Sequence, residues 1–291
     1  NKGIEVSVNY HYTAHEGENP FQFDVGLFFS RYTNDIIELA PSVKEQPYLT
    51  LRGVTTSVIK AGAPLGAFYG YQVTGIYQNE ADIANSASYE DARVGGFKFA
   101  DVSGPDGVPD GVIDGDDRTV IGNPHPDFIY SLSLGASYKR FDISMFFNGS
   151  QGNDLFDLTR QYTDFYAFPG AVSTRTLDAW SPENPGSMMP SPHSKAPTIE
   201  YQSSSYYVQD GSFFRMRNLQ LGYNVPVSNA FQGRVAALRL YASVTNLFTI
   251  TGYSGMDPEV SQYSSTFTAP GVDMGVYPVP RQYLLGVSVT F

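Results

Sequence analysis

The chain has 291 residues, no cysteine and a formal net charge of -11 at pH 7. The lack of cysteine excludes disulfides and thiolate metal sites. The acidic balance argues against a nucleic-acid partner, because such partners are bound through clustered Lys and Arg. No run of 18 apolar residues occurs, which excludes a transmembrane helix. The 21 Tyr, 20 Phe and 28 Gly residues favour a chain rich in strands and turns.

Apolar residues alternate with polar or small residues in seven segments. In chain order these are 4–12, 21–30, 128–138, 141–148, 219–225, 238–245 and 282–291. Successive side chains of a strand point to opposite faces, so each segment predicts a strand with one apolar face. The segments approach the roughly 9–11 residues that a tilted strand needs to cross a bilayer.

The last segment ends on an aromatic residue, Phe291. A strand that closes in this way is typical of bacterial outer-membrane barrels. We therefore predict an all-β fold, a transmembrane antiparallel β-barrel. Phe23, Ile143 and Val287 should face lipid, while Asp24 and Asp142 should face the interior, since charge on the lipid face is costly.

Counting by alternation gives roughly nine to eleven candidate strands in all. An open sheet with so few strands would leave the backbone groups of its edges unsatisfied in lipid. The chain also begins at Asn1, without a methionine or a signal sequence. We therefore expect an amino-terminal portion of the barrel to precede it.

Connections between the predicted strands differ in length. The turn at 138–140 is short, whereas 153–205 and 252–280 are long. Outer-membrane barrels have short periplasmic turns and long external loops, so the long connections should face outward. The spacing of Leu155, Leu158 and Tyr162 predicts a short helix within the first long connection.

Aromatic residues gather in the connection 153–205. They provide the candidate substrate platform, because ring faces can stack on a sugar or hold a peptide. The alternative is that they pack the loop onto itself or onto a partner protein. The candidate residues are Tyr162, Phe165, Tyr166 and Trp180.

An Asp-rich segment, 101–118, has the spacing of a calcium-binding loop. Counted from Asp106, it places Asp110 at position 5, Val112 at position 7 and Asp117 at position 12. Carboxylates at this spacing can surround Ca²⁺, with the Val112 carbonyl and Asp101 or Ser103 completing the shell. The segment departs from the motif, because Val108 stands at position 3 and position 12 is Asp rather than Glu. The alternative is an Asp/Gly turn without a metal.

Around this segment the chain resembles the carboxy-terminal half of the SusC/RagA family of TonB-dependent outer-membrane transporters. The residues that carry the resemblance are 66–83, 101–154, WSPENP at 180–185, 210–226, 238–260 and the final strand. They span nearly the whole chain and follow the family's order. The Asp-rich loop has about five extra residues, 105–109, relative to the family's usual DxNGDGxID form.

The resemblance implies the carboxy-terminal part of a 22-stranded barrel with a plugged lumen, of which the plug and the first strands lie upstream. It implies import of oligosaccharides or peptides into a cell of the Bacteroidetes. It also implies a SusD-like surface lipoprotein as a lid, and coupling to TonB through the upstream part.

Two other functions are weaker interpretations of the sequence. A passive porin or an adhesin-type barrel would share the strand pattern but would lack energy coupling. An enzyme is less favoured, because His11, His15, His125 and His193 show no pairing with Ser and an acid that would indicate a catalytic triad.

Overall fold

The structure is a computed structural model. It describes residues 1–14, 20–51, 53–104, 106–165, 170–192, 198–227, 234–260 and 270–291, with the backbone alone at 49–51. No helix in these ranges is long and apolar enough to cross a membrane.

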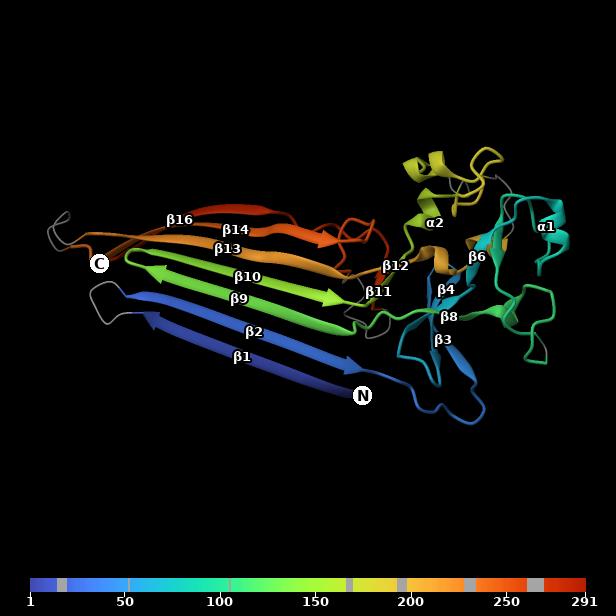
Figure 1. Cartoon of the computed structure of the whole chain (residues 1–291), viewed down its shortest axis with the longest axis horizontal. Helices are drawn as coiled ribbons and strands as arrows, with labels where there is room; N and C mark the ends of the chain where they lie inside the picture. The colour runs from blue at the N-terminus through green and yellow to red at the C-terminus, as the bar shows by residue number, and fades with distance from the viewer. Residues whose placement is uncertain are drawn as a thin grey trace.

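Seven long strands form one antiparallel sheet in the order β1-β2-β9-β10-β13-β14-β16. Figure 1 shows them side by side. Their bounds are β1 (Lys2–Ala14), β2 (Phe21–Thr33), β9 (Phe128–Tyr138), β10 (Phe141–Gln151), β13 (Phe213–Val225), β14 (Ala237–Thr251) and β16 (Gln282–Thr290). Each contains one alternating segment, so these strands and their antiparallel pairing are confirmed. The sheet is open, with β1 and β16 as its edges, so the closed 22-stranded barrel stays a prediction.

Pairing between strands keeps apolar residues with apolar residues across the sheet. One row of directly opposed residues runs Tyr10, Val25, Leu134, Met145, Leu219, Val244, Tyr283. A row of the other parity runs Thr13, Gln22, Ser137, Asp142, Gly222, Tyr241, Gly286. Opposed residues lie on the same face of a sheet, so the alternation of each strand adds up to one apolar and one polar face.

A β-bulge changes this parity near one end of β13. The register shifts between Met216 and Asn218, and Met216 pairs with Phe147 while Arg215 pairs with Asn148. Strict alternation along the strand would put Arg215 on the apolar face with Leu219. The extra residue moves Arg215 to the polar face, as bulges do when they redirect a side chain.

The connections between the seven strands are short at one end of the sheet and long at the other. β1–β2, β9–β10 and β13–β14 are joined at one end, while residues 34–127, 152–212 and 252–281 connect strands at the opposite end. In Figure 1 the long connections gather at the right. The sequence identified two of them, and it missed the longest, which contains the Asp-rich segment.

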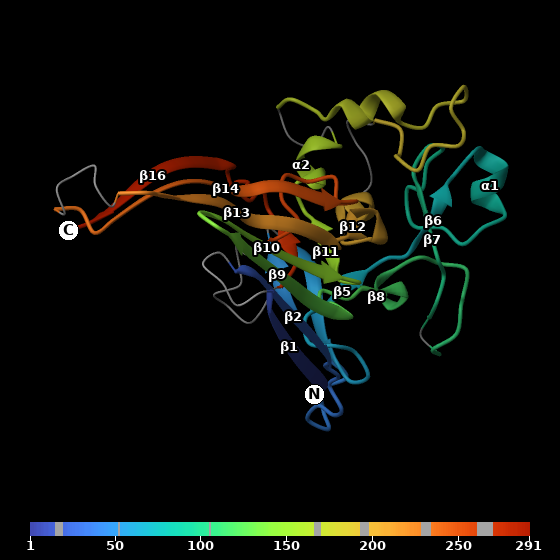
Figure 2. The same cartoon turned by 60° about the vertical axis from the view of Figure 1, so that its left-hand side comes forward.

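The three long connections fold into a second region, here called the cap. Its strands are β3 (Glu45–Leu51), β4 (Val54–Lys60), β5 (Ala67–Gly70), β6 (Val73–Ile76), β7 (Phe97–Phe99), β8 (Thr119–Gly122), β11 (Asp154–Asp157), β12 (Val208–Asp210) and β15 (Val272–Asp273). Its α-helices are α1 (Glu80–Ala84) and α2 (Arg160–Thr163), and its 3-10 helices are Gly115–Asp117, Thr174–Asp178, Thr198–Tyr201 and Ser205–Tyr207. Helix α2 confirms the predicted short helix. Figure 2 shows α1, β6 and β7 far from β16.

The small sheets of the cap join different connections. β3-β4-β5-β8 and β6-β7 lie within the first connection, whereas β11 pairs with both β12 of the second and β15 of the third. A bridge between Tyr71 and Ser204 ties the first connection to the second. The three connections therefore form one folded unit.

Candidate functional site

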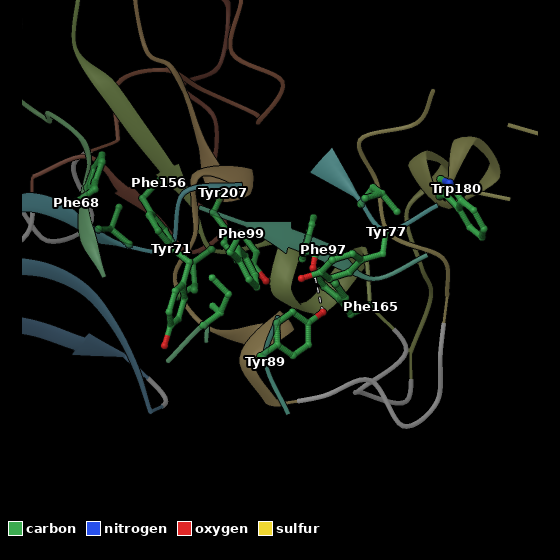
Figure 3. Close-up of a cluster of buried hydrophobic side chains, with 14 residues drawn as sticks. Phe68, Tyr71, Tyr77, Tyr89, Phe97, Phe99, Phe156, Phe165, Trp180 and Tyr207 are labelled. Atoms are coloured by element: carbon green, nitrogen blue, oxygen red, sulfur yellow. Dashed lines mark hydrogen bonds between the residues drawn. The ribbon is translucent and has the colours of Figure 1, made fainter. Parts of the chain in front are cut away.

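Buried aromatic side chains hold the cap together (Figure 3). Phe68 of the first connection packs on Phe156 of the second at 5.6 Å between ring centroids, and Phe97 packs on Phe165 at 6.2 Å. Offset and edge-on ring pairs at such distances stabilise a core beyond the area they bury. The cluster also includes Tyr71, Tyr77, Tyr89, Phe99, Trp180 and Tyr207.

The predicted substrate platform is divided by this core. Phe165 and Trp180 are 5% and 8% exposed, and Trp180 Nε1 donates a hydrogen bond of 3.0 Å to Gln78 Oε1. These two side chains pack the loop onto the first connection. Tyr162 is half-buried beside them, and Tyr166 lies outside the described residues. A role of Tyr162, Phe165, Tyr166 and Trp180 in substrate binding stays a prediction.

A buried carboxylate links the first and second connections. Glu200 is fully buried, and it accepts hydrogen bonds from Tyr89 at 3.0 Å and from Arg93 at 2.7 Å. Burial, and next the charge of Glu200, raise the pKa of Tyr89, so the phenol keeps its proton and donates. The arrangement satisfies a charge that would be costly if left unpaired in the cap.

Similar contacts recur in the second and third connections. Asp164 accepts from Tyr206 at 2.7 Å and forms an ion pair with Arg175 at 2.8 Å. Asp273 accepts from Tyr253 at 2.7 Å. These contacts could not be predicted from the sequence, because the partners lie between 11 and 42 residues apart. These contacts hold together segments of the cap that are distant in the sequence.

The Asp-rich segment directs its carboxylates at backbone N–H groups. Asp117 is buried and accepts from Val102 at 2.8 Å and from Asp114 at 2.9 Å, while Asp101 accepts from Gly111 at 2.7 Å. In the described ranges no group of three or more His, Cys, Asp or Glu comes together in a way that could hold a metal ion. The predicted ligand set was Asp101, Ser103, Asp106, Asp110, Val112 and Asp117, and it stays a prediction. The Ca²⁺ ion stays a prediction, which metal analysis of the purified protein can test.

Charged residues of the polar sheet face are paired across strands. Asp24 lies 2.6 Å from His11, and Asp142 lies 2.6 Å from Arg239. At the cap end, Arg215 is 3% exposed and lies 2.6 Å from Asp257 of the third connection. Both Asp24 and Asp142 occupy the polar face, as their parity predicted.

Two hollows of the sheet differ in the side chains that line them, one being mainly apolar and the other partly charged. The larger, about 780 Å³, lies at the short-turn end against apolar side chains such as Ile143, Leu221 and Leu285. The second, about 400 Å³, lies at the cap end, and we call it the rim hollow. It is lined by Arg215, Asn246, Phe248, Thr249, Thr251, Gly255, Met256, Asp257, Pro258, Pro278, Val279 and Arg281.

No family model matches the chain, but curated relatives that match over its full length are named TonB-dependent receptors. TonB-dependent receptor P3 of Formosa agariphila is 32% identical over 302 residues, which cover all of this chain and 28% of that protein. TonB-dependent receptor SusC of Bacteroides thetaiotaomicron is 28% identical over 305 residues and is covered to 26%. The resemblance to the SusC/RagA-type TonB-dependent transporters is confirmed.

A solved structure supports the fold. The structure of the RagAB peptide transporter superposes with a TM-score of 0.73 at 22% identity, covering 99% of this chain and 29% of that one. The chain thus spans less than a third of the length of the relatives it matches. Their names are those of receptors and transporters, which agrees with the expectation that the chain is not an enzyme.

Proposed function

We propose that the complete protein is the barrel subunit of a TonB-dependent nutrient importer in the bacterial outer membrane. The observation that carries the proposal is that the two faces of the sheet, and its two ends, differ in character. Seven strands share one apolar face, and all three long connections leave the same end. Together with the SusC and P3 relatives, this favours an importer over a passive porin or an adhesin.

The two faces of the sheet fit such a barrel. Tyr283, Leu285 and Val287 of β16 are 71%, 86% and 64% exposed, and lipid would cover them. The Asp142–Arg239 pair lies on the opposite face, which would line the interior. A charge on the lipid face near the midplane costs about 2–4 kcal/mol for Lys or Arg, so the opposite arrangement is unfavourable. The 22-stranded closure and the TonB-driven plug are what the family implies for the complete protein.

We infer that a SusD-like lipoprotein lid covers part of the cap. Leu177, Met188, Met256 and Tyr277 are 88%, 56%, 74% and 84% exposed there. Large apolar side chains that are exposed on a surface can be covered by a partner protein. The lid would cover part of them, and the substrate, an oligosaccharide or a peptide, would pass between the lid and the barrel.

Deletion of the gene and growth on defined nutrients test this function. The importer predicts loss of growth on a particular class of oligosaccharide or peptide, and the same loss when TonB is inactivated. A lipid-anchored second chain should copurify from native membranes. Normal growth on every such nutrient, with a barrel that purifies alone, would favour the porin or the adhesin.

A further inference from the structure

The larger hollow of the sheet, about 780 Å³, lies on the apolar face, and we call it the lipid-face hollow. One row of directly opposed residues crosses it over five strands, namely Ala136, Ile143, Leu221, Ala242 and Leu285. Alanine at two of these positions leaves a depression between the longer side chains. Its volume lies within the roughly 300–1,000 Å³ that is typical of ligand pockets.

Aromatic side chains border the lipid-face hollow on the side of the short turns. The next row of opposed residues contains Tyr138, Phe141 and Tyr223, and the rings of Phe141 and Tyr223 lie 4.7 Å apart between centroids. Tyr and Phe on the outer face of a barrel gather at the level where the hydrocarbon of the membrane meets the headgroups. The hollow therefore lies at the depth of acyl chains, directly beside the headgroup level.

Positive charge lies just beyond this aromatic row. Lys139 Nζ is 5.1 Å from the centroid of the Tyr138 ring, a cation–π contact that holds the ammonium at the edge of the lipid-face hollow. Arg140, the other residue of the turn between β9 and β10, is also basic and exposed. Asp142 borders the hollow too, but Arg239 holds its carboxylate at 2.6 Å on the polar face of the sheet.

We propose that the lipid-face hollow holds an acyl chain of an anionic phospholipid, whose phosphate binds the Lys139 ammonium. The proposal rests on the proposed function, which places the short turns, and so this lipid, in the periplasmic leaflet of the outer membrane. The tails of all phospholipids are equally apolar, so the hollow alone prefers none of them. The choice between lipids falls on the headgroup, and one Lys near an anionic headgroup is worth about fivefold in affinity.

The test uses the full-length receptor in mixed detergent and lipid micelles, with a phosphatidylglycerol that carries a photoactivatable acyl chain. Mass spectrometry of the cross-linked peptides locates the chain, and competition by unlabelled phosphatidylglycerol or zwitterionic phosphatidylcholine gives the relative affinities. Lys139→Gln removes the charge, and Arg31→Gln is its control, because Arg31 is exposed on the same face at the opposite end of the sheet. Ala242→Phe fills the hollow, and Val6→Phe adds the same ring to that face outside it.

Cross-links should fall on the peptides of β10, β13 and β14, and phosphatidylglycerol should compete at an about fivefold lower concentration than phosphatidylcholine. Lys139→Gln should abolish this preference and Arg31→Gln should keep it. Ala242→Phe should remove the cross-links from these strands, whereas Val6→Phe should not. Equal competition by the two lipids in the unaltered receptor, or a preference that survives Lys139→Gln, overturns the proposal. If the preference is missing while the protein still supports TonB-dependent growth, the lipid site fails and the importer stands.

Discussion

Arg239 reaches Asp142 across an intervening strand, with Nη2 2.6 Å from Oδ2. Their strands, β14 and β10, are separated by β13, where Gly222 lies opposite Asp142. A Cβ atom at Gly222 would lie 2.3 Å from Asp142 Oδ1 and 2.5 Å from Arg239 Nη2. The ion pair occupies the space that the missing side chain leaves free, and it binds three strands together on the polar face.

Gly222→Ala should therefore displace this pair and lower the thermal stability of the full-length receptor. Overpacking of this kind costs about 1–3 kcal/mol. Gly75→Ala is the matched control, since nothing lies within 4 Å of a Cβ there. Asp142→Asn should have less effect in the Gly222→Ala background than alone. Additive effects of the two changes would show that Gly222→Ala does not act through this ion pair.

Glu200→Gln should loosen the cap without altering the sheet. The change keeps the size of the side chain but leaves Arg93 without its buried partner, and breaking such a pair costs about 3–5 kcal/mol. Limited proteolysis should show faster cleavage in the cap and the same protection of the strands. The exposed Glu90→Gln variant serves as the control. Unchanged cleavage would mean that Glu200 does not fasten the two connections.

Trp180→Ala distinguishes a core residue from a ligand platform. Trp180 is buried in the aromatic cluster, so its truncation should cost about 3–5 kcal/mol of cap stability, measured by proteolysis or hydrogen exchange. Leu177→Ala should cost little, because Leu177 is 88% exposed. A stable Trp180→Ala protein that has lost only substrate affinity would restore the platform interpretation.

The ion pair of Asp257 gives the cap a dependence on pH. Burial alone would raise the pKa of Asp257, but hydrogen bonds from Arg215 and from the Glu259 and Val279 N–H groups hold it below its ordinary value. A lowered pKa contributes stability that is present above about pH 4 and is lost as the pH falls through the folded-state pKa. The difference in melting temperature between the unaltered protein and Asp257→Asn should therefore shrink below about pH 4.

Glu183→Gln is the control for this series, because Glu183 is exposed. A difference that stays constant from neutral to acid pH would contradict the role of the Asp257 carboxylate.

The sheet was predictable from sequence because its signal is local. Alternate residues of a strand lie on the same face, so the pattern within a segment such as 141–148 is enough to predict which side chains share a face. The bulge in β13, which redirects Arg215, could not be predicted in this way, since a bulge leaves no distinct mark in composition.

The cap was less predictable because its contacts join distant residues. Glu200 is 107 residues from Arg93, and the sequence around each residue does not predict their ion pair. The aromatic residues of 153–205 allowed two interpretations, a substrate platform or packing of the loop. The sequence does not show that Phe165 and Trp180 are buried.

The central claim is tested most directly by measuring, in whole cells, which end of the sheet is accessible from outside. The chain has no cysteine, so single cysteines can be introduced at Leu177 in the cap and at Lys139 in the β9–β10 turn. If the chain is part of an outer-membrane barrel with its cap outside, a membrane-impermeant maleimide should label Leu177→Cys in intact cells. Lys139→Cys should react only after the outer membrane is permeabilised. Labelling of Lys139→Cys from outside, or equal labelling of both positions in intact cells, would contradict the account.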